Sequence, residues 1–269
     1  MPRLVQPVFR IAVACAATAF LSLGAMAAGS DEPAARTHSE KVQPSRDATL
    51  PPAYGPTPSK VHVIVYSDFQ CPVCARITAA THQIAEEWPG EVRVEFRQLA
   101  LTMHRHAEDA AVASLAAHRQ GKFWAMHDVL FANQRALDPD SLTAHARQVG
   151  LDPKRFAKDY ADPALRERVR AETALAQRLG ATGTPTFVVN GKVTSGWGSW
   201  HAFRQQVERE RAAVDALLAN GTKLADVHAL RAREQLGTPE AFAAYKADVI
   251  DPLAKTHSPT RARKPAARR

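Results

Sequence analysis

The sequence predicts an α/β fold with a pair of parallel strands, a long helical insertion and further helices near its C-terminal end. Residues 61–66 form an apolar, β-branched run typical of a buried strand. In residues 92–97 apolar and charged side chains alternate, as in a strand with one covered face. A helical pattern over residues 72–88 separates the two strands. Strand, helix and strand within about 40 residues predict a right-handed crossover between parallel neighbours.

The middle of the chain has helical periodicity and no strand pattern. Asp-Pro pairs put a capping acid before a proline at three expected helix starts, and Gly150 and Gly180 end helices. A hairpin is expected around Asn190-Gly191, with strands at 187–189 and 192–194. The expected helices cover residues 107–120, 123–134, 139–149, 153–160, 163–179, 200–218, 224–235 and 239–250.

The first strand leads directly into the motif Cys71-Pro72-Val73-Cys74. Thiols three residues apart on the first turn of a helix lie on the same face, so they can close into a disulfide and reopen. Cys71 falls at the expected N-cap and Pro72 at the first helical position, which tolerates proline because its missing N–H has no intrahelical partner. The helix N-terminus favours a thiolate at Cys71, so we expect Cys71 to be the nucleophile and Cys74 the resolving thiol.

A secretory signal peptide is predicted over residues 1–28. Two arginines precede an apolar run over residues 11–23, which is too short for a membrane span, and Ala-Met-Ala at 25–27 resembles a cleavage site. An uncleaved anchor helix is the alternative. Removal of the leader would remove Cys15 and leave only the two thiols of the motif. A secreted protein with a single C-x-x-C pair is expected to use it for redox chemistry.

The excess positive charge is concentrated at the C-terminal end. The formal net charge of +8 falls to +6 without the leader, and five of these charges lie within residues 258–269, which contain no acid. The rest of the chain is close to neutral, which argues against nucleic-acid binding. We expect residues 253–269 to be a basic disordered tail that is either solvated or in weak contact with an anionic envelope surface.

The C-x-x-C spacing also occurs in zinc sites, which need four ligands. The sequence has no second pair of this kind. Histidines could supply the missing ligands, but His104 and His106 lie in a polar connection and His127 in an expected helix, with nothing that fixes them near the cysteines. We therefore expect no metal and no organic cofactor.

A second informative stretch, residues 183–191, begins with Gly-Thr-Pro and runs into the first hairpin strand. Together with the strand before Ser-Asp-Phe-Gln-Cys-Pro-Val-Cys, the Gly-Lys-Phe-Trp at 121–124 and the order of helices, it resembles the DsbA-like thiol-disulfide oxidoreductases. The resemblance extends from residue 61 to residue 209. It implies that Pro185 is a cis-proline lying against both cysteines, and that Thr184 offers backbone hydrogen bonds to a substrate peptide.

Two positions depart from the family pattern. Val73 stands where strongly oxidising members have a cationic histidine. Val65 stands where members can keep an acid, so that Asp68 or Glu95 would have to serve any proton transfer, although Asp68 also suits a structural hydrogen bond in the loop. Thiolate stability sets how readily the disulfide is reduced, so Pro72, Val73 and Asp68 are the expected redox-tuning positions, and the direction of the reaction stays open.

The resemblance implies a thioredoxin fold with an inserted helical domain and a C-terminal helical extension. The extension is expected either to cover a sheet edge or to mediate dimerisation. The expected parts after the signal peptide are a Pro-rich linker at 29–60 that docks near residues 50–54, a thioredoxin-like domain at 61–103 and 181–221, the inserted domain at 104–180, the extension at 222–252 and the tail.

The function implied is disulfide exchange with protein thiols in the periplasm. The first interpretation is a dithiol oxidase that uses Cys71 and Cys74 and is regenerated by a redox partner. The alternative within the class is a reductase or isomerase, in which Cys71 attacks first. The alternative from another class is a non-catalytic envelope chaperone or metal-binding module, since a fold does not fix function.

Overall fold

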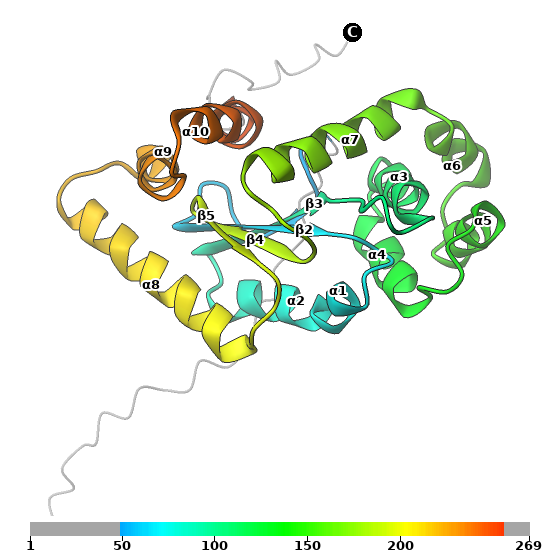
Figure 1. The fold of residues 1–269 in the computed structure, drawn as a ribbon, viewed down its shortest axis with the longest axis horizontal. Coiled ribbons are helices and arrows are strands. Elements are labelled where there is room, and N and C mark those ends of the chain that lie inside the picture. The colour runs from blue at the N-terminus through cyan, green and yellow to red at the C-terminus, as the bar shows by residue number, and fades with distance from the viewer. Residues whose placement is uncertain (1–48, 256–269) are drawn as a thin grey trace, which may run out of the picture. The chain divides into compact units, whose positions relative to one another are not determined.

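A mixed five-stranded sheet lies at the centre of residues 49–255, the part of the chain that the computed structural model describes (Figure 1). The strand order is β1-β3-β2-β4-β5. The strands are β1 (Ala53–Tyr54), β2 (Val61–Ser67), β3 (Val92–Gln98), β4 (Thr186–Val189) and β5 (Lys192–Ser195). β2 is parallel to β3, and β4 is antiparallel to both β2 and β5. The predicted parallel pair and hairpin are confirmed.

Helices cover both faces of the sheet (Figure 1). On one side lie α1 (Pro72–Arg76), α2 (Thr78–Glu87) and α8 (Trp200–Ala219). On the other lie α7 (Pro163–Arg178), α9 (Leu224–Gln235) and α10 (Pro239–Tyr245), which continues as the π-helical η1 (Lys246–Ile250) and α11 (Asp251–Lys255). The insertion adds α3 (Ala107–His118), α4 (Phe123–Ala132), α5 (Pro139–Gln148) and α6 (Pro153–Tyr160). None of the helices described is long and apolar enough to cross a membrane.

The three Asp-Pro helix starts are formed as predicted. At each one the proline occupies the first turn, and the aspartate side chain accepts a hydrogen bond from a backbone N–H in that turn. These bonds satisfy donors that a helix leaves unpaired at its N-terminus. The capping residues are Asp138, Asp152 and Asp162, and they open α5, α6 and α7.

Successive side chains of β2 and β4 enter two different cores. Val63, Val65 and Phe187 pack with α2 and α8, whereas Ile64 and Val188 pack with α7, α9 and η1. A third core joins the insertion to the cysteine motif. The two-residue period of a strand explains the division between the first two cores.

The expectation that β3 has only one covered face is wrong. All seven residues of β3 are buried, including Arg93, Glu95 and Arg97 on the face that was expected to be solvated. The extension explains this burial, because the backbone carbonyl of Asp248 in η1 accepts a hydrogen bond of 2.9 Å from Arg97 Nη2. The local alternation identified the two faces correctly, but burial of the second face depends on helices far along the chain.

Two other elements differ in detail from the prediction. The single helix expected over residues 72–88 is interrupted at Ile77, whose N–H bonds the Cys74 carbonyl three residues back and tightens the turn. The docking expected near residues 50–54 is confirmed, since Leu50 O bonds His118 Nε2 at 2.9 Å and β1 pairs with β3. The predicted signal peptide, the linker before residue 49 and the tail beyond residue 255 lie outside the described residues.

The β4–β5 turn ties the sheet to the extension. Asn190 has φ 46° and Gly191 φ +96°. The Asn190 side chain accepts a hydrogen bond from His62 N at 2.8 Å and donates one to Lys60 O at 3.1 Å. A Cβ atom on Gly191 would lie 2.5 Å from Cα of Ala232 in α9. Only glycine therefore fits this close approach of the turn to the helix.

We expect Gly191→Ala to destabilise the protein by about 1–3 kcal/mol more than Gly221→Ala. Both positions have positive φ and share the conformational penalty of alanine. The space around Gly221 is open, so only the change at Gly191 pushes α9 away. The free energies of unfolding come from urea titration of both variants. Equal losses would show that the turn does not hold the extension.

Candidate active site

The cysteine motif lies where β2 ends and α1 begins. Cys71 is the N-cap of α1, with φ −73° and ψ 119°, and Pro72 occupies the first turn. The predicted positions of both residues in the helix start are therefore confirmed. Cys71 is 6% exposed and Cys74 1% exposed, and both are free thiols. Pro72 is exposed and Val73 half-buried, so these two residues form the accessible side of the motif.

A second segment, distant in sequence, lies against the Cys71 sulfur. Cys71 Sγ is 3.5 Å from the carbonyl oxygen of Thr184, and the Thr184–Pro185 bond is cis. Pro185 is buried directly before β4. The antiparallel pairing of β2 with β4 brings the segments together, because Tyr66 at the end of β2 faces Thr186 at the start of β4. The cis bond implied by the family resemblance is present at the expected position.

The two sulfurs have opposite acidities. The pKa of Cys71 is lowered to about 5, chiefly because the Cys74 thiol donates a hydrogen bond to it, with further contributions from Thr184 and from the N–H groups of Val73 and Cys74. These hydrogen bonds outweigh burial, which acts in the opposite direction. The pKa of Cys74 is raised, because that thiol is the donor in the pair and is buried. At neutral pH the reduced site therefore holds a Cys71 thiolate beside a Cys74 thiol.

The Thr184 hydroxyl is placed to stabilise this thiolate. It contributes to the lowering of the Cys71 pKa. Its oxygen is buried and has no other hydrogen-bond partner among the described residues. A hydroxyl can turn its proton toward whichever acceptor is present. When the Cys71 sulfur loses its proton, this group can therefore donate to it.

Asp68 is a loop anchor whose hydrogen-bonding capacity is occupied. Its Oδ1 accepts from Gln70 N at 2.7 Å, and its Oδ2 lies 2.9 Å from Leu101 N and 2.8 Å from His104 Nδ1. The carboxylate thus fastens the motif to the connection between β3 and α3. These contacts agree with the structural hydrogen bond in the loop that the sequence suggested for Asp68. A role of Asp68 in tuning the redox potential stays a prediction.

Glu95, the other acid considered for proton transfer, belongs to a separate buried group. Its Oε1 accepts from Arg97 Nε at 2.6 Å, and its Oε2 lies 3.2 Å from His62 Nε2. Burial alone would raise the Glu95 pKa, but Arg97 and His62 outweigh it and hold that pKa well below its usual range. A carboxylate that stays ionised in this way is a poor proton acceptor.

Two residues that the sequence did not single out support the motif. Gln134, just beyond α4, donates from Nε2 to Phe69 O at 2.7 Å and to Cys71 O at 2.9 Å. Ser67, the last residue of β2, hydrogen-bonds to the Cys74 sulfur and partly offsets the rise in its pKa. No sequence pattern marks Gln134, because its contact joins segments more than sixty residues apart. Ser67 precedes the motif and could have been considered from its position alone.

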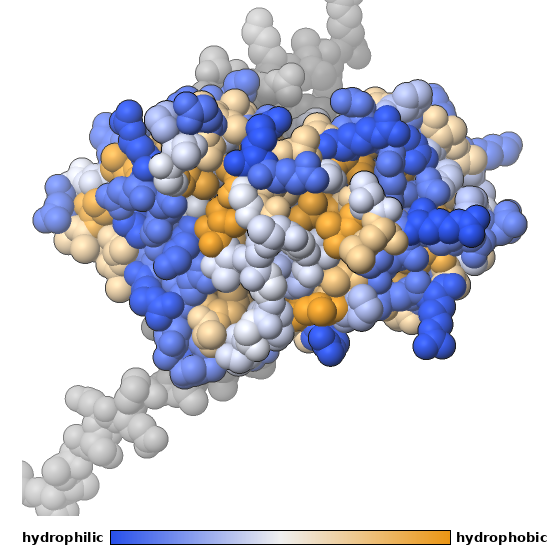
Figure 2. Space-filling model, viewed as in Figure 1, coloured by the Kyte–Doolittle hydropathy of each residue, from blue (hydrophilic) through white to orange (hydrophobic). Residues whose placement is uncertain are grey.

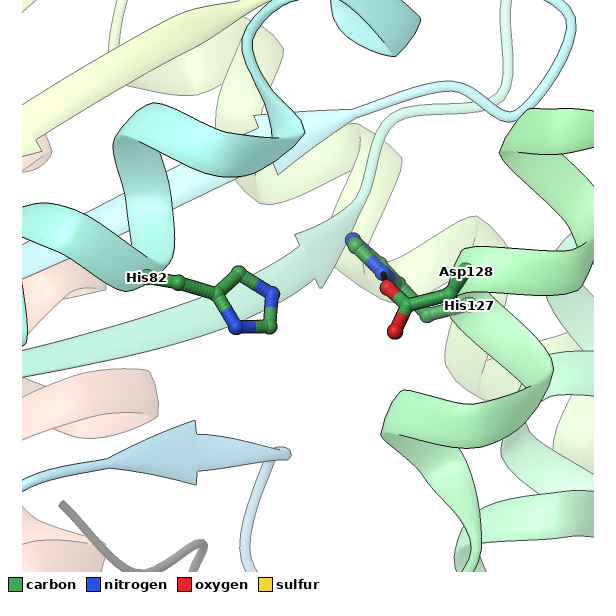
Figure 3. A group of neighbouring side chains, drawn as sticks. All are labelled: His82, His127 and Asp128. Atoms are coloured by element: carbon green, nitrogen blue, oxygen red, sulfur yellow. Dashed lines mark hydrogen bonds and ion pairs between the residues drawn. The ribbon is translucent and has the colours of Figure 1, made fainter. Parts of the chain in front are cut away.

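A group of three potential metal ligands lies outside the cysteine motif. His82 of α2 points toward His127 and Asp128 of α4, and their ligand atoms lie within 4.8 Å of one another (Figure 3). His127 Nδ1 is already hydrogen-bonded to Asp128 Oδ1 at 2.8 Å. We interpret the group as a buried histidine held by its neighbouring carboxylate.

The family model and the solved structures to which this chain is similar agree on one family. The family model described as DSBA-like thioredoxin domain matches residues 62–208. A solved thioredoxin-like oxidoreductase from Silicibacter pomeroyi DSS-3 is 30% identical, with a TM-score of 0.56 over 62% of this chain and 96% of that one. The oxidised form of BdbD from Bacillus subtilis, 22% identical, shares the fold with a TM-score of 0.53 over 64% of this chain and 97% of that one.

The curated relatives are much longer proteins. The Na(+)/H(+) antiporter NhaA 3 of Salinispora tropica is 38% identical over 152 residues, which are 56% of this chain and 22% of that protein. The antiporter NhaA of Herminiimonas arsenicoxydans is 36% identical over 151 residues, 56% of this chain and 24% of that protein. The chain spans about a quarter of the length of these relatives. Their names therefore carry no activity over to it.

A dithiol at a helix start, beside a cis-proline that precedes an inner strand of a mixed sheet, defines the class of thioredoxin-fold thiol-disulfide oxidoreductases. The family model covers more than half of the chain. This protein therefore belongs to the DSBA-like thioredoxin family, and the resemblance seen in the sequence is confirmed.

We expect the thiolate absorbance of the reduced protein to titrate with a midpoint near pH 5, the pKa of Cys71. The unfolded thiol has a pKa of about 8.5. The lowered value stabilises the folded reduced protein fully above the unfolded pKa, and this contribution is lost as the pH falls through about 5. A midpoint like that of a free thiol would contradict the hydrogen-bonded site.

Thr184→Val should raise the Cys71 pKa, because it removes the hydroxyl and keeps the backbone carbonyl. Thr182→Val is the matched control, since Thr182 is exposed two residues away and is not among the groups that lower the Cys71 pKa. The measurement is the rate of Cys71 alkylation as a function of pH. If the profiles of both variants coincide with that of the wild type, the Thr184 hydroxyl plays no part.

Proposed function

We propose that the protein is a dithiol oxidase that passes its Cys71–Cys74 disulfide to protein substrates. The lowered pKa of Cys71 carries this proposal. A stable thiolate stabilises the reduced form of the pair, so the disulfide form becomes the stronger oxidant. A thiol of low pKa is also a better leaving group, which favours release of the oxidised product.

The proposed reaction takes two exchanges. A substrate thiolate attacks Cys71 Sγ of the disulfide, the bond to Cys74 breaks, and Cys74 takes up a proton as the thiol of higher pKa. A second substrate thiolate then attacks the substrate sulfur of the mixed disulfide, and Cys71 leaves as the thiolate. The substrate has lost two electrons and the protein has gained them. A partner of higher potential must take these electrons to restore the disulfide.

The surface around the motif suits a polypeptide substrate. On the face that includes β4 and β5, Figure 2 shows a central band of hydrophobic and weakly polar residues with hydrophilic residues on both sides. Met103, in the connection that Asp68 holds, is 81% exposed. The Thr184 carbonyl lies next to Cys71 and is placed to meet substrate backbone. An unfolded chain presents both apolar side chains and backbone donors to such a surface.

The proposed setting is the periplasm, where an oxidising pair can act. A predicted leader and the absence of other thiols after its removal support this location. The substrates are protein thiols, and no nucleic acid is involved. The alternative, a reductase or isomerase, is favoured by Val73, which lacks the positive charge that would stabilise the thiolate further.

Equilibration with glutathione should give a potential clearly more oxidising than the value of about −270 mV that is typical of thioredoxin. Val73→His should make the pair still more oxidising, because an imidazolium next to Cys71 stabilises its thiolate. Val73→Ala is the control for loss of the side chain and should stay close to the wild type. A wild-type potential near that of thioredoxin would overturn the oxidase in favour of the reductase.

Cys71→Ala should abolish oxidative refolding of a reduced substrate protein, because Cys74 alone cannot form the disulfide that substrate thiolates attack. The assay compares the wild type and the variant for both oxidative refolding and insulin reduction. Equal behaviour of the two proteins in both assays would instead support a non-catalytic chaperone.

A further inference from the structure

A small cavity lies between the sheet and the C-terminal extension, on the face opposite α2 and α8. Its volume is about 180 Å³. The sheet contributes His62 from β2 and Arg93 from β3, and α9 contributes His228. Aliphatic side chains from η1 and α11, among them Ile250 and Leu253, form the opposite wall. Neither cysteine lines this cavity, so its contents are separate from the redox site.

Arg93 is the unusual feature of this cavity. Its side chain is 3% exposed, and neither Nε nor Nη2 has a hydrogen-bond partner among the described residues. The nearest carboxylate oxygen, Glu95 Oε2, is 3.8 Å from Nε. Buried polar groups are normally hydrogen-bonded, and a buried charge without a close partner is costly. The guanidinium therefore has two donors without a partner among the described residues, and Arg93 lines the cavity.

The charges around Arg93 do not balance. Arg93 and Arg97 are both ion-paired with Glu95, and the shorter contact, 2.6 Å, is to Arg97. His62 and His228 add no negative charge, and burial lowers the pKa of each, so both are neutral at pH 7. The group therefore has an excess of one positive charge.

The acidic side chains of the covering helices do not supply the missing charge. Glu172 of α7, which lies near Arg97, pairs with Arg168. Asp248 of η1 pairs with Arg178, and Asp251 of α11 pairs with Lys246. Asp226 of α9 is exposed. One monovalent anion inside the cavity would neutralise the excess and could accept from both free Arg93 donors, as carboxylates do from an arginine fork.

The remaining wall restricts which anion fits. Pro58, Ile250 and Leu253 offer hydrophobic contacts, and Thr57 and Ser59 are the two hydroxyl-bearing residues of the lining. Ala225 and Ala254, at the start of α9 and in α11, are both exposed lining residues, so the cavity reaches the surface between these helices. A phosphate dianion would overcompensate the charge and leave the apolar wall without a partner. A carboxylate with a short hydrocarbon chain matches both the Arg93 guanidinium and the apolar wall opposite it.

We propose that this cavity binds a small aliphatic monocarboxylate, with the carboxylate on Arg93 and the hydrocarbon chain against Ile250 and Leu253. The ligand bridges the sheet and the extension, so it stabilises their contact. This site gives the extension a binding role that does not depend on the direction of the redox reaction.

The test is calorimetric titration of the full chain with hexanoate, with hexylamine as the probe of equal chain length and opposite charge. Hexanoate should bind saturably at one site and raise the melting temperature, and hexylamine should do neither. Inorganic phosphate should bind at least tenfold more weakly than hexanoate. Equal binding of hexanoate and hexylamine, or no saturable hexanoate binding because the cavity holds only water, would overturn the proposal.

Two variants locate the binding. Arg93→Gln should weaken hexanoate binding at least tenfold by removing the charge. If this variant unfolds, Ala225→Phe tests the site independently, since it blocks the rim and leaves every charge in place. Ala216→Phe on α8 is the matched control, because Ala216 is also an exposed helical alanine. This variant should bind hexanoate as tightly as the wild type does. Unchanged hexanoate binding in Ala225→Phe would place the ligand elsewhere and refute the assignment.

Discussion

The contact between the Cys71 sulfur and the Thr184 segment is the interaction on which the rest of the site depends. It joins residues 113 positions apart, and the sheet makes it possible because β2 lies between β3 and β4. The register that pairs Tyr66 with Thr186 places the cysteine motif after β2 next to the Thr184 segment before β4. A shift of one residue would turn every side chain of β4 to the other core, so the hydrophobic pattern of the strands also fixes the geometry of the active site.

The inserted helices form part of the redox site as well as covering it. Cys71 and Cys74 belong to the same core cluster as Phe69, Phe96 and the buried faces of α3 and α4. This packing desolvates both sulfurs, which would by itself raise both pKa values. The hydrogen bonds to Cys71 reverse the effect at that sulfur only. The difference in acidity therefore comes from local hydrogen bonding within a shared apolar environment.

Much of the fold could be predicted because its signals are local. The Asp-Pro caps, the Asn-Gly turn and the apolar strands each act over a few residues, and the cysteine motif and Gly-Thr-Pro carry a family pattern. Burial of Arg93 and the Gln134 contact could not be predicted in this way. Both arise where segments distant in sequence meet, at the extension and at the insertion, and the alternation of residues along β3 is the same whether its second face is solvated or covered.

The most direct test of the central claim is to trap the mixed disulfide. The Cys74→Ser protein is incubated with a disulfide-containing substrate, and the adduct is mapped by peptide mass spectrometry. We expect a stable one-to-one adduct at Cys71, because its thiolate attacks and no second thiol resolves the mixed disulfide. We expect no adduct in the reciprocal Cys71→Ser protein, because the remaining Cys74 thiol is protonated. Equal adduct formation at either cysteine would contradict the assignment of Cys71 as the sulfur that exchanges with substrates.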